Sequence, residues 1–187
     1  MTNTTEKLME KASAFHGHVC GGLAIGVKAC EALAEFWNLN LSDSQVPNST
    51  LKEKIVCVAE NDSCSIDAIQ SILGCTLGSG TLFVNNVGKQ AFSFFDRESQ
   101  KSLRICLNVN FDSTPKEERK NIILATPIRS LFKYSEPNIA VPRRAKIFRN
   151  ARCERCLEYS AESCIRLYGG KLVCTECYRI LRDSENI

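Results

Sequence analysis

Histidine is scarce in this 187-residue sequence: there are two, beside two methionines and one tryptophan. Long apolar runs are absent as well. No stretch approaches 18 uninterrupted apolar residues, which argues against a membrane-spanning helix. The first residues are polar and lack the apolar segment of a secretory signal, so we expect a cytoplasmic protein. The net charge of +3 is small, which argues against a protein built chiefly to hold phosphate backbones.

Cysteine, in contrast, is abundant, with eleven residues. An odd number of thiols in a chain without a secretory signal is not typical of a disulfide framework. We therefore expect metal ligands, reactive thiols and buried thiols among them. Cys30, Cys57 and Cys106 lie in apolar runs and are interpreted as core residues.

Both histidines fall in one stretch, Phe15–Gly26, together with a cysteine. His16, His18 and Cys20 alternate, so an extended backbone would point all three side chains to one side. Imidazole and thiolate are ligands for Zn²⁺ and also serve as proton carrier and nucleophile. Cys20 falls where a helix is expected to begin, a position that favours the thiolate. The alternative is a chance pair of histidines beside a small buried cysteine.

A second thiol-rich segment follows the apolar, β-branched stretch 55–60, which is typical of a buried strand. If this strand packs against the helix predicted over 22–37, its carboxyl end brings further polar side chains toward the histidines. We predict a core metal site made by His16, His18, Cys20 and Cys64. The side chains expected to line the same cleft, with His16, His18 and Cys20 in a catalytic role, are those of Asp62 and Cys75.

Periodicity predicts the remaining elements of the core. Helices are expected over 4–15, 22–37, 66–73, 116–124 and 128–132, and strands over 55–60, 81–85, 90–95 and 103–109. Gly22 and Gly26 leave one flank of the second helix bare, so another element can pack closely there. These elements predict an α+β core with a small mixed sheet and packed helices.

The C-terminal region carries two Cys-x2-Cys knuckles, Cys153–Cys156 and Cys174–Cys177, with 17 residues between them. Four thiolates at this spacing close a tetrahedral zinc site. Gly169-Gly170 predicts a hairpin turn between the knuckles, and a helix follows the second one. The sequence therefore predicts a treble-clef zinc finger. Its Zn²⁺ would be structural, because all four positions are cysteines.

Composition divides the chain into three regions. We predict a core domain over 1–136, a basic linker over 137–152 and the finger over 153–187. Residues 1–140 carry 14 Lys and Arg against 15 Asp and Glu, whereas residues 141–187 carry 10 against 6. Such a basic segment is most often a solvated connector, and nucleic-acid contact is the alternative.

The motifs also carry a family resemblance. Phe15-His-Gly-His-Val-Cys-Gly-Gly-Leu-Ala-Ile-Gly26 resembles the Phe-His-Gly-His-x-Cys-Pro-Gly-x-x-x-Gly motif of the FmdE family, which takes its name from formylmethanofuran dehydrogenase. Segments 60–70, 74–80 and 88–92 are similar to its second block, and the four-cysteine finger is similar to an appendage of some members. Gly21 stands where the family usually has proline. The resemblance implies an α+β core, a homodimer, a metal-capable His/Cys cleft and a link to molybdenum or tungsten formylmethanofuran dehydrogenase.

Our preferred hypothesis is a metal-binding accessory protein of such an oxidoreductase system, with Zn²⁺ in the finger and a second Zn²⁺ or another transition metal in the core. Its partners would be components of the oxidoreductase, reached through the finger. The alternative is a zinc-finger module that binds nucleic acid or protein and has no chemistry in its core. A third interpretation is purely structural, with core cysteines that bind nothing. The sequence leaves open whether the chain is an enzyme.

Overall fold

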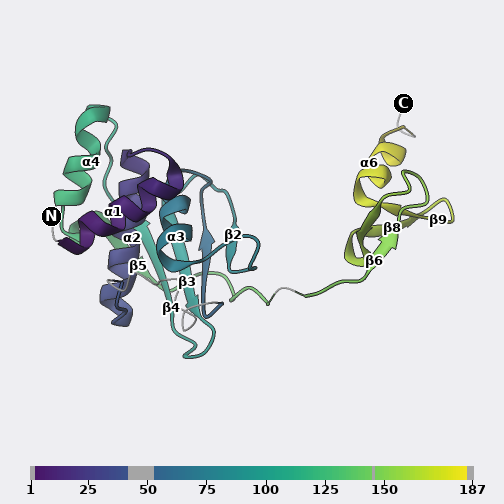
Figure 1. The fold of residues 1–187 in the computed structure, drawn as a ribbon, viewed down its shortest axis with the longest axis horizontal. Coiled ribbons are helices and arrows are strands. Elements are labelled where there is room, and N and C mark those ends of the chain that lie inside the picture. Colours follow the sequence, from purple (N-terminus) through teal and green to yellow (C-terminus); the bar gives the residue numbers. More distant parts are fainter. Residues whose placement is uncertain (1–2, 42–52, 145, 185–187) are drawn as a thin grey trace. The chain divides into compact units, whose positions relative to one another are not determined.

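The computed structural model describes residues 3–41, 53–144 and 146–184. The chain divides into two compact units, Met1–Arg144 and Ala145–Ile187 (Figure 1). Each unit has its own sheet structure and its own buried cluster. None of the helices within these described ranges has the length and apolar character needed to cross a membrane.

The first unit is built on a five-stranded sheet in the order β2-β1-β3-β4-β5. Its strands are β1 (Ile55–Ala59), β2 (Leu82–Val84), β3 (Ala91–Asp96), β4 (Ser102–Leu107) and β5 (Phe132–Ser135). β1 pairs parallel with β2 and antiparallel with β3, and the other pairs are antiparallel. All five residues of β1 are buried, as its apolar character on both faces predicted. The predicted α+β class with a small mixed sheet is therefore confirmed.

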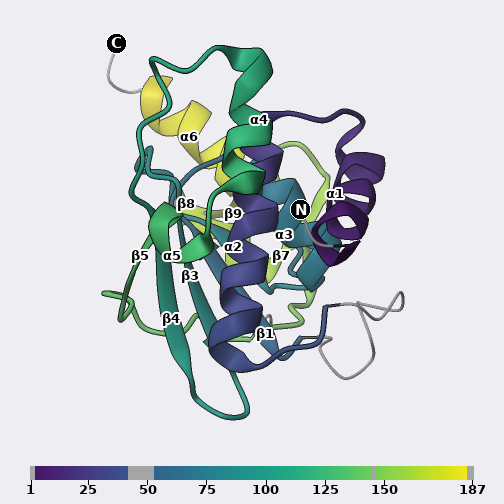
Figure 2. The same ribbon diagram turned by 90° about the vertical axis from the view of Figure 1, so that its left-hand side faces the viewer.

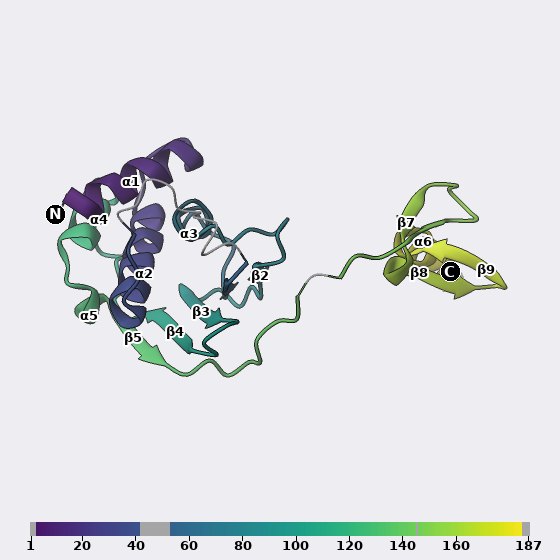
Figure 3. The ribbon, with the colours of Figure 1, turned by 60° about the horizontal axis from the view of Figure 1, so that its bottom comes forward.

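Helices cover one face of this sheet (Figure 3). They are α1 (Asn3–His16), α2 (Gly21–Trp37), α3 (Ser65–Leu73), α4 (Lys116–Ala125) and the single turn α5 (Ile128–Leu131). The main core lies between helices and sheet, where Phe92, Phe94 and Ile105 are fully buried. Alternate residues Val56, Val58 and Phe95 form a smaller cluster on the opposite face, as strand periodicity requires.

α2 is the central helix of the first unit (Figure 2). Ten of its 17 residues are buried, and it packs against α1, α3, α4 and α5. The bare flank predicted from Gly22 and Gly26 is the surface that receives α3. A Cβ atom at Gly26 would lie 2.8 Å from the Ala68 Cβ and closer still to the Ser65 carbonyl oxygen. Glycine therefore sets the distance between these two helices.

A polar network holds the loop between β1 and α3. The Asn61 side-chain oxygen accepts hydrogen bonds from the Ser63 backbone N–H at 3.2 Å and from the Ser65 hydroxyl at 3.1 Å. Gln90 donates to the Ser63 hydroxyl at 2.7 Å. Asp62 or Ser63 is the cap that the sequence favours for α3, but Cys64 occupies the N-cap position without a side-chain capping bond. The network fixes the loop, and with it Cys64, in place of that cap.

β5 is the element that the sequence analysis missed. The helix predicted over 128–132 ends at Leu131, and the strand begins at Phe132 and pairs with β4. Phe132 and Tyr134 alternate toward the main cluster, which is a strand pattern. Two alternating residues are too few to outweigh the helical spacing before them, so the edge strand emerges only from pairing with β4.

The second unit contains two short antiparallel pairs and a helix. β6 (Asn150–Arg152) pairs with β7 (Tyr159–Ala161), and a 3-10 turn (Glu162–Cys164) leads to the hairpin of β8 (Ile165–Tyr168) and β9 (Lys171–Cys174). Gly169 and Gly170 both have positive φ, 56° and 79°, as a two-residue hairpin turn requires. α6 (Thr175–Ser184) follows. Knuckle, hairpin and helix form the predicted treble-clef arrangement.

The segment 137–152, predicted as a linker, begins in the first unit and ends in the second. Arg97 donates from Nη2 to the carbonyl oxygens of Pro142 at 3.3 Å and Arg143 at 3.4 Å, within the first unit. β6, in the second unit, begins at Asn150. The three domain boundaries proposed from composition stay a prediction.

Candidate metal centre

Three side chains of the first unit bring metal-ligating atoms together. One ligand atom each from His16, Cys20 and Cys64 lies within 4.8 Å of the other two. We call these three residues the core triad. His16 ends α1, Cys20 is the N-cap of α2 and Cys64 is the N-cap of α3. Three helix ends thus meet at one point of the fold.

Local structure explains this meeting of helix ends. Gly17 has a φ of +89°, which turns the chain after α1 at no steric cost. Cys20 is extended and caps α2, because its sulfur accepts a hydrogen bond from the Leu23 N–H at 3.3 Å. A Cβ atom at Gly22 would lie 3.2 Å from the Cys64 Cβ. The absence of a side chain at Gly22 therefore leaves room for Cys64 to approach Cys20.

Asp67 fixes the orientation of the His16 ring. Its Oδ2 lies 2.7 Å from His16 Nδ1, and Gln70 donates to its Oδ1 at 3.1 Å. The His16 side chain is only 12% exposed. Its other nitrogen, Nε2, lies 3.9 Å from the Cys20 sulfur. A carboxylate on one imidazole nitrogen leaves the other as a metal ligand, which is the usual arrangement around protein-bound zinc.

The two thiols of the core triad influence each other. Burial raises the pKa of the Cys64 thiol, and the hydrogen bond and charge of Cys20 raise it further. Two thiols that resist joint ionisation are the donors that a divalent cation stabilises as thiolates. Two thiolates and one imidazole fit Zn²⁺, and three protein ligands leave its fourth position open. The residues present therefore fit a metal ion.

A cleft of about 560 Å³ opens beside the core triad. Cys20, Gly22 and Cys64 line one side, and Phe111 and residues of α4 line the other. This volume lies within the range of small-molecule sites. A group bound at the open position of a metal would therefore have room for a body of several atoms.

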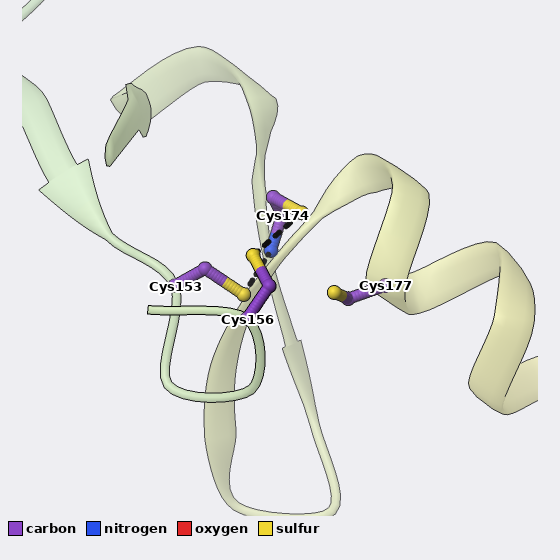
Figure 4. Close-up of side chains that lie close together, drawn as sticks. All are labelled: Cys153, Cys156, Cys174 and Cys177. Atoms are coloured by element: carbon purple, nitrogen blue, oxygen red, sulfur yellow. Dashed lines mark hydrogen bonds between the residues drawn. The ribbon is translucent and has the colours of Figure 1, made fainter. Parts of the chain in front are cut away.

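The second unit holds a different set of ligands. One sulfur each from Cys153, Cys156, Cys174 and Cys177 lies within 4.8 Å of the other three (Figure 4). The Cys174 N–H donates to the Cys153 sulfur at 3.3 Å and lowers the pKa of that thiol to about 6. We call these four residues the finger tetrad. Four thiolates complete a tetrahedral shell, so this set can hold a structural metal.

Comparison with known proteins identifies the family. Residues 15–140 match the model described as "FmdE, Molybdenum formylmethanofuran dehydrogenase operon". The chain belongs to the FmdE family. The resemblance drawn from the Phe15–Gly26 motif is thereby confirmed, and the core triad lies within the matched residues.

Two relatives of this FmdE protein illustrate its range. A probable S-adenosyl-L-methionine-binding protein of Archaeoglobus fulgidus is 26% identical over 181 residues, which cover 81% of this chain and 48% of the relative. The chain thus spans about half the length of that relative. A crystal structure of an FmdE-like protein of tungsten formylmethanofuran dehydrogenase, from Syntrophus aciditrophicus, is 24% identical, with a TM-score of 0.62. The match covers 93% of this chain and 91% of the other, and it shows the fold.

The FmdE core does not bring all predicted site residues together. His18 is exposed, and its ring centroid lies 4.4 Å from that of His16, outside the core triad. Asp62 is exposed in the loop before α3. Cys75 is fully buried and donates to the Ile55 carbonyl oxygen at 3.4 Å. Burial raises the pKa of the Cys75 thiol to about 12.

α3 explains why Cys75 lies away from the core triad. Cys64 precedes the helix and Cys75 follows its C-cap, so a rise of ~1.5 Å per residue carries them to opposite ends. The expectation that Cys75 lines the cleft is therefore corrected. The contribution of α4 to the cleft was missed, because nothing in its polar sequence indicates which helix it contacts.

Proposed function

We propose that this FmdE protein is a metal-dependent accessory protein of a molybdenum or tungsten formylmethanofuran dehydrogenase-type system. The core triad would hold Zn²⁺ or a similar ion, and the finger would hold a structural Zn²⁺ and dock a partner. The observation that supports this proposal best is the convergence of His16, Cys20 and Cys64 beside an open cleft. The link to the oxidoreductase system is supported by the family description.

The residues of the site would divide the work as follows. His16, Cys20 and Cys64 hold the ion, and Asp67 keeps the His16 ring in the orientation that presents Nε2. His18, exposed beside His16, is placed to exchange protons with solvent. A metal with an open fourth position supplies Lewis-acid chemistry to the group that it binds. Whether turnover follows depends on the partner that supplies the bound group.

The first experiment is metal analysis of anaerobically purified full-length protein. We expect about two metal ions per chain, because the two ligand sets can each hold one. A His16→Ala/Cys20→Ser variant should lose one ion, and a Cys153→Ser/Cys156→Ser variant should lose the other. His18→Ala and Cys164→Ser are matched controls, because neither residue belongs to a ligand set. One ion per chain, lost only with the finger, would contradict the proposal.

The alternative function is nucleic-acid binding through the basic C-terminal region. Five of its cationic residues lie in a short stretch: Arg143, Arg144, Lys146, Arg149 and Arg152. Phosphate binding through such residues weakens steeply with salt. We expect no binding of labelled DNA or RNA by fluorescence anisotropy at about 150 mM salt, an ionic strength at which exposed charges are screened beyond ~8 Å. Binding with a steep salt dependence would favour the alternative.

Two further expectations belong to the same proposal, a cytoplasmic location and a homodimer. Light scattering of the full chain tests the dimer directly. A monomer at micromolar concentration would leave the metal sites unaffected, because the core triad and the finger tetrad are each complete within one chain.

A further inference from the structure

Two cationic side chains stand on the wall of the cleft that faces the core triad. Lys116 and Arg119 both belong to the first turn of α4 and line the cleft. Residues three apart on a helix lie on the same side. The two charges therefore point to one region of the cleft, on the wall opposite Cys20 and Cys64.

The structure fixes Arg119 in place. Its Nε donates to the Thr114 carbonyl oxygen at 2.8 Å, and its Nη2 donates to the Asp112 carbonyl oxygen at 3.2 Å. Its Cβ would lie 3.3 Å from a Cβ atom at Gly21, so the side chain starts against the first residue of α2. A guanidinium that is already held loses little freedom when it binds a ligand.

Neither charge is neutralised within the protein. Among residues 3–41, 53–144 and 146–184, no carboxylate forms an ion pair with Lys116 or Arg119. Glu117 lines the same cleft and offsets one of the two positive charges. The α4 wall thus keeps an excess positive charge next to a metal-capable group.

The rest of the cleft wall is apolar. Ile25, Phe111 and Ile123 line it, and Gly21 and Gly22 add no side chains. A cleft of about 560 Å³ with apolar walls and a few convergent polar groups is typical of a small-molecule site. A ligand that fits it combines an apolar body with an anionic group.

We propose that this cleft binds a small organic anion, with the anionic group on Lys116 and Arg119 and a donor atom directed at the core triad. This inference rests on the proposed metal site, because the donor atom needs an ion to bind. It adds the chemical class of the ligand. It also assigns a specificity-determining role to Lys116.

A matched pair of thiols tests the proposal. 3-Mercaptopropionate and 3-mercaptopropionamide have the same length and the same sulfur donor, and they differ in the charge at the far end. Both are titrated into full-length protein loaded with Co²⁺, and binding is followed by the thiolate-to-cobalt charge-transfer absorption. The finger tetrad has no open position, so it does not take up an added thiol.

We expect the wild-type protein to bind the carboxylate about tenfold more tightly than the amide, since two partly screened ion pairs contribute roughly two- to fivefold each. Lys116→Gln should reduce this preference to about two- to threefold. Lys120→Gln is the matched control, because Lys120 lies on the same helix and lines a different groove with Glu6 and Glu10. That control should keep the full preference. Glu117→Gln should raise the preference by about twofold.

The outcomes separate this inference from the proposed function. If both thiols bind equally and Lys116→Gln changes neither, the anion site is wrong and the metal site stands. If Lys120→Gln lowers the preference as much as Lys116→Gln does, the effect is a general one of helix charge, and the assignment to Lys116 is wrong. If Cys20→Ser leaves the cobalt spectrum unchanged, the core triad binds no metal, and both proposals fall.

Discussion

The two ligand sets of this protein differ in what holds them in place. The finger tetrad lies in a unit whose buried cluster consists of Cys153, Val173 and Cys177, with a few partly buried neighbours. The core triad lies at the edge of a large cluster formed by five helices and a sheet. In the finger, metal and fold depend on each other. In the core, packing places the ligands and leaves one position of a metal open.

The difference shows how chemistry is separated from stability in one chain. A four-thiolate set spends every ligand position on structure and has none left for a substrate. The core triad needs only three protein ligands, because helices α1, α2 and α3 already meet there. Each set should therefore respond to substitution according to its surroundings, with the largest effect in the finger and smaller effects in the core.

The largest effect is expected in the finger. Cys153→Ser should abolish metal binding there and unfold the second unit, because so small a unit lacks a core of its own. Hydrogen exchange read by mass spectrometry should show complete loss of protection in this unit and none in the first. Cys164→Ser, at an exposed thiol outside the tetrad, is the control. Retained protection after metal removal would break the comparison.

The next effect concerns the contact between α2 and α3. Gly26→Ala places a Cβ atom against Ser65 and Ala68, so the helices must separate. We expect a loss of about 2–3 kcal/mol in the free energy of unfolding, measured with urea, and weaker metal binding at the core triad. Gly78→Ala is the matched control, because a Cβ atom there meets nothing within 4 Å. Equal stability of the two variants would show that this contact does not position Cys64.

A smaller effect should follow from loss of the carboxylate behind His16. Asp67→Asn removes the charge at 2.7 Å from Nδ1 and should weaken metal binding at the core triad by about 10–100-fold. Competition with a chromophoric chelator measures this change. The finger should keep its affinity, because its four ligands are all cysteines. Asp62→Asn, at an exposed carboxylate, serves as the control and should leave both affinities unchanged.

The smallest effect belongs to an ion pair in the first unit. Arg104 donates to Glu60 from Nε at 2.6 Å and from Nη2 at 2.8 Å, and these bonds lower the pKa of the Glu60 carboxyl. A lowered pKa in the folded state stabilises the protein above the ordinary value near ~4.3, and this stabilisation is lost as the pH falls through the lowered value.

Glu60→Gln should therefore cost about 1 kcal/mol at pH 7, and the difference from wild type should shrink below pH ~4. Urea unfolding at several pH values measures it. Glu35→Gln, in an exposed pair with Arg129, should cost less than about 0.5 kcal/mol at every pH. A Glu60→Gln penalty that does not change with pH would show that packing, and not charge, is responsible.

Much of the fold could be predicted, because its elements carry strong local patterns. α2 is apolar at helical spacing, β1 is a short β-branched stretch, and the finger is defined by cysteine spacing and two glycines. β5 could not be predicted in the same way, since a four-residue edge strand depends on its partner β4. Pairing between distant segments is a property of the whole fold and leaves little trace in a short sequence.

The candidate site was predictable only in part. Cys20 and Cys64 could be expected to meet, because both precede helices and a glycine flank lets those helices approach. The histidine that joins them is His16 and not His18, because α1 continues through His16 and turns at Gly17. The alternation argument assumed an extended backbone before Cys20, and a helix does not preserve that alternation. Cys75 was misplaced because the length of α3 was not considered.

The position of Cys20 and Cys64 at two helix starts has a mechanical consequence. These residues are far apart in the chain, with all of α2 and β1 between them. A metal that joins their sulfurs acts as a reversible staple and closes a long loop in the unfolded chain. By mass action, its contribution reaches ~4 kcal/mol when the free ion is a thousandfold above its dissociation constant. The melting temperature of the first unit would then report how much metal its surroundings supply.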